Sequence, residues 1–176
     1  QESIDTLSNK GPKDLLDLSL KLGSKILIQS KIVHNFKDAL ELQNSVIQNG
    51  TALKKFKDMI QNQNGDLNSF KKKTNPKYVQ YVFSENNGKL TNFNTEKIGW
   101  GLVELGCGYK YHNSILDYSA GIEFLKKIGD KIKPGDAVYR IFNSNEEKLK
   151  LASKYLIDTF IVSNKSSEFN LIIDEF

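Results

Sequence analysis

The residues of this chain that could act in catalysis are few and lie far apart in the sequence. They are two histidines, His34 and His112, and a single cysteine, Cys107. A nucleophilic pair needs a hydroxyl or thiol within hydrogen-bonding reach of a base, and neither histidine has such a partner nearby in the sequence. We therefore expect His34 to have a surface or capping role and His112 to lie in a polar loop. Cys107 stands between two glycines, and we expect it to be an unreactive small side chain.

Two further patterns could carry chemistry, and both favour a structural interpretation. The carboxylates Asp117 and Asp130 lie where turns lead into strands, and they do not form an acid/base pair. A loop that binds phosphate usually precedes a helix and combines glycine with lysine and hydroxyl residues. The stretch Gly106-Cys107-Gly108 follows a predicted helix and lacks those partners, so it predicts a helix C-cap and a turn.

Composition and charge narrow the class of protein. The chain has 176 residues and a formal net charge of +4, and its basic residues are lysines apart from Arg140. The cluster Lys71-Lys72-Lys73 could contact nucleic acid, but it precedes Pro76 and is better explained as a solvated linker, so we expect no nucleic-acid partner. No apolar run is long enough to span a bilayer. One cysteine cannot form an internal disulfide, which indicates a reducing compartment, and we expect the cytoplasm.

The first 67 residues predict helices joined by tight turns. Residues 2–7 indicate the end of a helix, and Pro12 suits the start of the next one. That helix has apolar residues at helical spacing and a broad apolar face, which predicts burial; they include Leu15, Leu18, Leu22 and Ile26. Asn35 predicts the N-cap of a helix over residues 36–48, and Thr51 the cap of a following helix. Gly23 would allow another element to approach closely.

Composition changes after a polar linker at residues 68–77, and strand patterns follow. We predict strands at residues 78–83, 88–93, 119–124, 136–142 and 169–173, and a helix at 95–105 capped by Thr95. Another helix should start at Asn143 or Ser144 and extend to Phe160. Gly129-Asp130 and Pro134-Gly135-Asp136 predict two tight turns. The predicted organisation is residues 1–67, a linker at 68–77, and an α+β part at 78–176.

Several of these blocks, in this order, resemble the C-terminal part of thymidine and pyrimidine-nucleoside phosphorylases. The matching blocks are Pro12–Gly23, Gly50–Gln63, Gly99–Gly108, Ile115–Ile122 and Ile128–Gly135. The resemblance covers nearly the whole chain. Members of this family are more than twice as long, and the chain begins at Gln1 within a predicted helix, so we expect a C-terminal fragment of a longer protein.

The resemblance implies both fold and activity. Family members are α/β enzymes, so residues 1–67 would be helices of their large central domain. Residues 78–176 would be a β-rich C-terminal domain similar to the lipoyl/biotinyl (barrel-sandwich) fold. Phosphate attacks the anomeric carbon of a pyrimidine 2′-deoxyribonucleoside in this family, which releases the free base and 2-deoxyribose 1-phosphate. Members are pentosyltransferases of pyrimidine nucleoside salvage and catabolism, and the resemblance implies a homodimer.

The resemblance places the catalytic residues upstream of this chain. None of the family's phosphate-binding or base-binding residues maps onto it, so we assign no catalytic residue and expect the segment alone to be inactive. No organic cofactor is implied, and inorganic phosphate is a co-substrate. Some members bind a monovalent cation through a glutamate that corresponds to Glu2 by its spacing from Leu7 and Gly11-Pro12. Tyr109 stands where many members have a basic residue, and Lys110 follows it.

One alternative belongs to a different class of protein. The glycine-aspartate hairpin is also typical of a stand-alone lipoyl/biotinyl-like carrier or binding module without catalytic activity. Such a carrier needs a lysine at an exposed hairpin tip, often beside methionine. Met59 lies in a predicted helix and Lys89 is not flanked in that way, so the phosphorylase resemblance is the stronger hypothesis.

Overall fold

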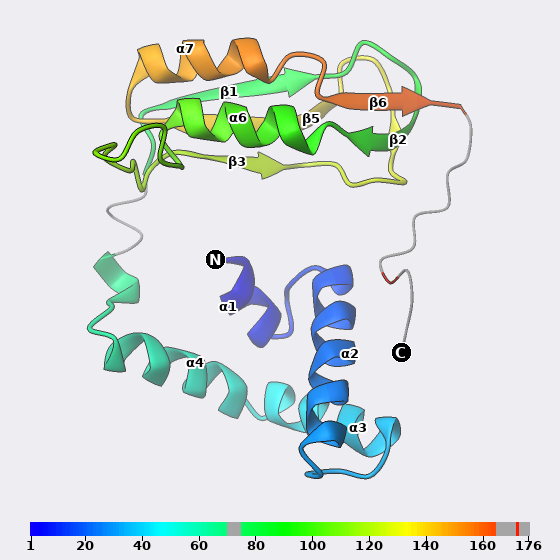
Figure 1. The fold of residues 1–176 in the computed structure, drawn as a ribbon. Helices are drawn as coiled ribbons and strands as arrows, with labels where there is room; N and C mark the ends of the chain where they lie inside the picture. The colour runs from blue at the N-terminus through cyan, green and yellow to red at the C-terminus, as the bar shows by residue number, and fades with distance from the viewer. Residues whose placement is uncertain (70–74, 165–171, 173–176) are drawn as a thin grey trace. The chain divides into compact units, whose positions relative to one another are not determined.

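A computed structural model describes residues 1–69, 75–164 and 172. The chain divides into two compact units (Figure 1), which we call the helical unit, Gln1–Leu67, and the sheet unit, within Asn68–Asn170. The predicted lysine cluster at residues 71–73 and most of the predicted strand at residues 169–173 lie outside the described residues. The assignment of the two parts to domains of a larger enzyme stays a prediction.

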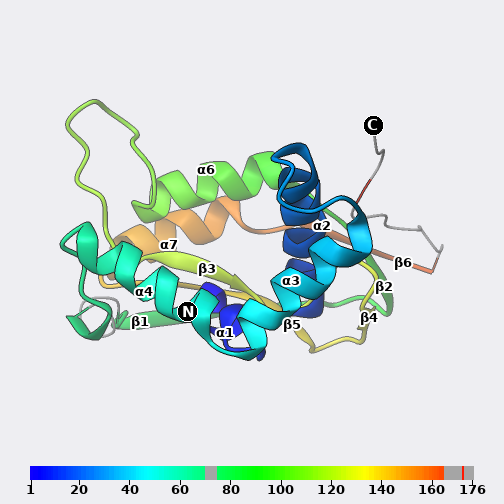
Figure 2. The same cartoon turned by 90° about the horizontal axis from the view of Figure 1, so that it is seen from below.

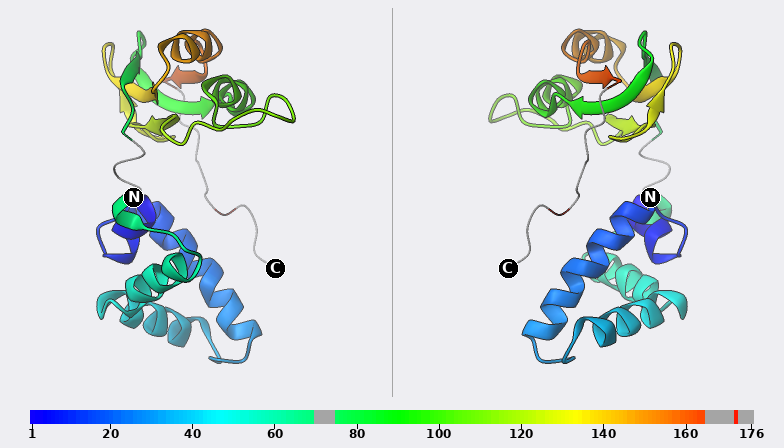
Figure 3. Two further views of the ribbon diagram at one scale, coloured as in Figure 1. Left: turned by 90° about the vertical axis from the view of Figure 1, so that its left-hand side faces the viewer. Right: turned by 90° about the vertical axis from the view of Figure 1, so that its right-hand side faces the viewer.

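The helical unit consists of helices joined by short turns (Figure 3), and most of the predicted helix boundaries are confirmed. Its helices are α1 (Glu2–Leu7), α2 (Lys13–Gln29), α3 (Phe36–Gln48) and α4 (Thr51–Asn62). The Asn35 side chain accepts a hydrogen bond from the Asp38 backbone N–H at 3.0 Å, as an N-cap should. The predicted cap at Thr51 is wrong. Gly50 is the N-cap of α4, because its φ of 78° makes the sharp reversal after α3.

The side-chain amide of Gln43 connects helix α3 to helix α2. Gln43 on α3 donates from Nε2 to the Leu20 carbonyl at 3.1 Å and to Ser24 Oγ at 2.8 Å. Ser24 is fully buried. Gly23 allows this approach, because a Cβ at that position would lie 2.1 Å from Gln43 Oε1. The expected role of Gly23 is therefore confirmed.

Much of the apolar surface of the helical unit stays exposed. Leu22 and Ile26 are 58% and 62% exposed, although their spacing predicts burial. Helix α4 contains no buried residue. The reason is that each helix contacts its neighbours along only part of its apolar face, so the predicted burial of these two residues is not found within the described chain.

The described residues of the sheet unit form antiparallel sheets with helices packed on them, which confirms the predicted α+β class. Sheet A has the order β1-β5-β3 and sheet B the order β4-β2-β6. The strands are β1 (Tyr78–Phe83), β2 (Gly88–Phe93), β3 (Gly121–Phe124), β4 (Lys131–Ile132), β5 (Ala137–Asn143) and β6 (Phe160–Ser163). Helices α6 (Thr95–Leu105) and α7 (Glu146–Tyr155) lie side by side along one face of sheet A (Figure 2). No helix of the described residues could cross a membrane.

Both predicted caps in the sheet unit are displaced. Asn94, and not Thr95, caps α6, since its side chain accepts from the Lys97 N–H at 3.0 Å. Asn145 caps α7 in place of Asn143 or Ser144, because β5 continues through Asn143. The Asn143 Oδ1 instead accepts a hydrogen bond from the Asn145 N–H at 2.6 Å.

The prediction that the last helix reaches Phe160 is wrong. Helix α7 ends at Tyr155, and Phe160 begins strand β6, where it pairs with Phe93. The chain reverses at Asp158, whose φ is +55°. A core contact explains the difference, because the Tyr139 hydroxyl bonds to the Leu156 carbonyl at 2.5 Å, next to the helix end.

The core of the sheet unit lies between sheet A and the two helices. Its fully buried side chains include Tyr139, Ile141, Leu90, Leu105, Ile132 and Leu156. Gly101 allows α6 to approach the end of α7, because a Cβ there would lie 2.7 Å from the Leu156 side chain. The Tyr139 hydroxyl also lies 2.6 Å from Thr159 Oγ1. Tyr139 therefore connects β5 to the segment between α7 and β6.

Tyr139→Phe removes this hydroxyl and leaves the ring in place. We expect the free energy of unfolding to fall by about 1–2 kcal/mol, because the buried Leu156 carbonyl and Thr159 hydroxyl lose a partner. Urea denaturation of the 176-residue chain measures the change. Tyr118→Phe is the matched control, since Tyr118 is 80% exposed. Equal stability of the two variants would contradict this role of the Tyr139 hydroxyl.

Candidate functional site

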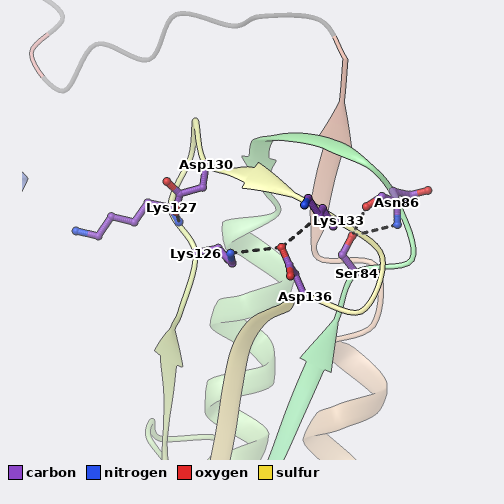
Figure 4. Close-up of polar contacts among 7 residues, drawn as sticks. All are labelled: Ser84, Asn86, Lys126, Lys127, Asp130, Lys133 and Asp136. Atoms are coloured by element: carbon purple, nitrogen blue, oxygen red, sulfur yellow. Dashed lines mark hydrogen bonds and ion pairs between the residues drawn. The ribbon is translucent and has the colours of Figure 1, made fainter.

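The two glycine-aspartate turns between β3 and β5 each contain a hydrogen bond of the same kind, from a backbone N–H to the aspartate three residues later. The Asp130 carboxylate accepts a hydrogen bond from the Lys127 backbone N–H at 2.7 Å, and the Asp136 carboxylate accepts one from the Lys133 N–H at 3.1 Å (Figure 4). Gly129 and Gly135 have φ values of 97° and 88°, which favour glycine. Both predicted turns are confirmed, and the short strand β4 lies between them.

The second turn is also tied to the end of β1. The Ser84 N–H donates to the Asp136 carbonyl at 2.9 Å, and the Gly135 N–H donates to the Ser84 carbonyl at 2.8 Å. Ser84 is buried, and its hydroxyl accepts from the Asn86 N–H at 3.1 Å (Figure 4). The Lys126 ammonium lies 3.4 Å from the Asp136 carboxylate. Asp136 therefore holds three segments of the chain together.

These contacts give the carboxylates of the turns a structural role. The pKa of Asp136 is lowered, chiefly by the hydrogen bond from the Lys133 backbone and further by the Lys126 ammonium. A general acid at neutral pH needs the opposite shift. Asp130 accepts from its own turn, as predicted for a turn residue.

The glycine stretch after α6 is a helix C-cap and a turn, as predicted. Gly106 has a φ of 90°, and the Cys107 N–H donates to the Leu102 carbonyl at 2.9 Å. Cys107 is exposed as a whole, but neighbouring protein atoms partly shield its thiol from water. This partial burial raises the pKa of the Cys107 thiol, and the nearby Asp117 carboxylate raises it further. A thiol with a raised pKa is a weak nucleophile at neutral pH, which agrees with the predicted unreactive cysteine. Asp117 itself accepts from the Ser119 N–H and hydroxyl at 2.9 and 2.6 Å.

Lys110 fixes the loop that follows this turn. Its ammonium lies 2.6 Å from the Glu104 carboxylate on α6, and the Glu104 side chain is only 10% exposed. Tyr109, beside it, is 68% exposed. The partner of Lys110 could not be predicted from the sequence, because a six-residue separation across a turn gives no periodic signal. The loop is therefore attached to α6 through Lys110 and not through Tyr109.

The remaining predicted site residues lie apart from one another. His34 is exposed in the turn before α3, and His112 is exposed in the loop after α6. Glu2 is exposed on α1, and the described residues contain no group of three or more His, Cys, Asp or Glu side chains that could hold a metal ion. The described part of the chain does not complete a cation site around Glu2, so its role as a ligand stays a prediction.

A hollow of about 340 Å³ lies in the helical unit, where α1, α2 and α3 meet the start of α4. Its lining is mostly leucine, isoleucine and valine, with the hydroxyls of Ser3, Thr6 and Ser19 and the amide of Gln43. None of these lining side chains is charged, whereas phosphate sites usually include cations or clustered backbone N–H groups. The hollow therefore does not provide a phosphate site by itself.

Asp136→Asn tests the charge of the second turn without changing its shape. A lowered pKa in the folded state means that the charge stabilises the fold above the unfolded pKa of about 4, and that this stability is lost as the pH falls further. We expect the variant to have a lower Tm than the wild type at pH 7, and this difference in Tm to disappear as the pH falls through the lowered pKa of Asp136. Thermal unfolding monitored by circular dichroism measures both. Lys126→Met keeps the hydrogen bond from Lys133 and should therefore lower the Tm less than Asp136→Asn does. If the Tm difference between Asp136→Asn and the wild type did not change with pH, the stabilising role of the Asp136 charge would be refuted.

Comparisons with known proteins agree with the family resemblance. The family model for the pyrimidine nucleoside phosphorylase C-terminal domain matches residues 89–162, which run from β2 to β6. A pyrimidine-nucleoside phosphorylase of Staphylococcus haemolyticus (strain JCSC1435) is 32% identical over 176 residues, covering 98% of this chain and 40% of that protein. A pyrimidine-nucleoside phosphorylase of Staphylococcus aureus (strain USA300) is 33% identical over 170 residues, covering 93% and 39%.

These relatives are similar to both units of the chain and not only to the matched domain. The chain spans about 40% of the length of these curated relatives. The glycine turns and the C-cap described above lie within the matched residues 89–162. The chain therefore belongs to the pyrimidine-nucleoside phosphorylase family, and its residues 89–162 match the C-terminal domain of that family.

Proposed function

We propose that this chain is the C-terminal part of a pyrimidine-nucleoside phosphorylase, a pentosyltransferase of pyrimidine nucleoside salvage and catabolism. The observation that carries the proposal is that similarity to these enzymes extends over 98% of the chain. A domain shared with an unrelated protein would give similarity only over the matched residues 89–162. The helical unit also matches, which favours a phosphorylase over an isolated module.

The proposed reaction is phosphorolysis of a pyrimidine 2′-deoxyribonucleoside. A phosphate oxygen bonds to the anomeric carbon while the bond from that carbon to the base nitrogen breaks. The electron pair leaves with the base, which takes up a proton, and the sugar is released as 2-deoxyribose 1-phosphate. Such a reaction needs a phosphate site and hydrogen-bond donors to the departing base. We propose that these groups lie in the part of the relatives that this chain does not span.

The described residues support a structural contribution to that enzyme. Their carboxylates hold turns, as Asp130 and Asp136 do, and their one cysteine has a raised pKa. The exposed apolar side chains of α2 supply surface that can pack against a further domain. In the complete enzyme we expect a homodimer in the cytoplasm, with Glu2 as one ligand of a monovalent cation.

The stand-alone carrier hypothesis has weaker support. A carrier lysine must stand at an exposed hairpin tip, whereas Lys89 lies within β2 and pairs with Ser163 and Lys131 of the neighbouring strands. The similarity of the sheet unit to the lipoyl/biotinyl fold remains part of the proposal. It rests on the hairpin that contains the two turns.

A phosphorolysis assay tests the proposed function directly. We expect a protein that carries this sequence and the full length of its relatives to release thymine from thymidine or uracil from uridine when phosphate is present. The 176-residue chain alone should release neither, because we expect the phosphate site to lie in the part of the relatives that this chain does not span. Separation of base from nucleoside by liquid chromatography measures the product.

Two controls make the assay specific. Replacing phosphate by sulfate should abolish base release, and 2′-deoxyadenosine should not be cleaved. Base release by the long protein without phosphate would indicate a hydrolase and refute phosphorolysis. Phosphate-dependent release by the 176-residue chain would show that its own residues form the site.

A further inference from the structure

Strand β1 forms one end of sheet A and has a free edge. It pairs with β5 along all six of its residues, and no described strand pairs with its other side (Figure 1). The irregularity in this pairing adds a residue to β5, so β1 itself continues without interruption. None of its residues is charged or proline. Edge strands are usually protected by charges, proline or bulges, and one without them can pair with another strand.

The outer face of β1 is also unusually apolar. Val79, Tyr81 and Phe83 alternate along one side of the strand and are 43%, 45% and 57% exposed. The rings of Tyr81 and Phe83 lie 6.1 Å apart. The other side of the strand carries Val82, which packs against the core beside α6 and α7. A solvated face of an antiparallel sheet is normally polar, so this face indicates a partner.

The sequence around β1 is complementary to itself in one register. When two copies pair antiparallel about a two-fold axis at Tyr81, Val79 of each copy lies opposite Phe83 of the other. Lys77 precedes the strand and Glu85 follows it after Ser84, so the same register brings Lys77 of one copy towards Glu85 of the other at both ends. Both of these charged residues are exposed, and they flank the strand. Opposite charges that face each other across a strand pair stabilise it.

The two neighbouring symmetric registers are less favourable. Opposite residues in a continuous antiparallel sheet must point to the same face, so the axis must pass through a residue and not between two residues. Centring the axis on Gln80 places Lys77 opposite Phe83, and centring it on Val82 places Glu85 opposite Val79, so neither register pairs the two charges. Charge complementarity therefore selects the register centred on Tyr81.

We propose that the edge of β1 is a docking surface for β1 of a second copy of this chain, in the register centred on Tyr81. The pairing joins two copies of sheet A into one six-stranded antiparallel sheet. An interface of two short strands is small, so the dimer forms weakly and depends on concentration. The proposal rests on the edge and charges of β1 and is independent of the proposed enzymatic function.

A charge-reversal series tests the register. Sedimentation velocity of the 176-residue chain should show a mass that rises with concentration from 20.0 kDa towards twice that value. Lys77→Glu places like charges opposite each other at both ends, and we expect it to weaken association roughly tenfold. Glu85→Lys should do the same, and the double variant should restore the wild-type affinity. A mass of 20.0 kDa at every concentration, or a double variant as weak as the single ones, would overturn the proposal.

Disulfide cross-linking tests the same register independently of affinity. In a Cys107→Ser background, Tyr81→Cys places two thiols opposite each other, with Cβ atoms about 4.5–5.5 Å apart, near the range that a disulfide spans. Mild oxidation should give a covalent dimer on a non-reducing gel. Val79→Cys faces Phe83 of the other copy and should not cross-link, and Tyr118→Cys controls for random collisions. Equal cross-linking of all three variants, or none for Tyr81→Cys, would refute the pairing.

Discussion

The sheet unit depends on the buried hydroxyl of Tyr139. It bonds to the Leu156 carbonyl at 2.5 Å and lies 2.6 Å from Thr159 Oγ1, so that one side chain of β5 connects the end of α7 to the approach of β6. Burial raises the pKa of Tyr139, which therefore remains a neutral donor at physiological pH. A buried polar group needs a partner, and these contacts determine where the last helix ends.

In the second glycine-aspartate turn, too, a single residue makes several polar contacts. Asp136 bonds to the Lys133 backbone and pairs with Lys126, while its own carbonyl accepts from Ser84 at the end of β1. The carboxylates of both turns, Asp130 and Asp136, thus accept hydrogen bonds from the backbone. The sheet unit is therefore similar to part of an enzyme family, although its described carboxylates form no catalytic acid/base pair.

The helical unit and β1 both leave apolar surface exposed, and they need different partners. Leu22 and Ile26 lie on a helix, where only packing can cover them. The edge of β1 also offers free backbone groups, so a strand can add to it in a defined register. The exposed apolar face of α2 agrees with the proposal that this chain is part of a larger phosphorylase. The free edge of β1 agrees with the proposal that two copies of the chain associate.

The elements whose signals are local could be predicted from the amino-acid sequence. Helix α3, strand β2 and the turns at Gly129 and Gly135 were predicted at their observed positions, because their caps and glycines act through neighbouring backbone groups. The family resemblance also came from the order of such motifs. Tertiary structure alone decided that Phe160 lies in a strand and that Lys110 pairs with Glu104. The pairing of Phe160 with Phe93 joins residues far apart in the chain, while the Lys110–Glu104 contact crosses a turn whose path no periodic pattern reveals.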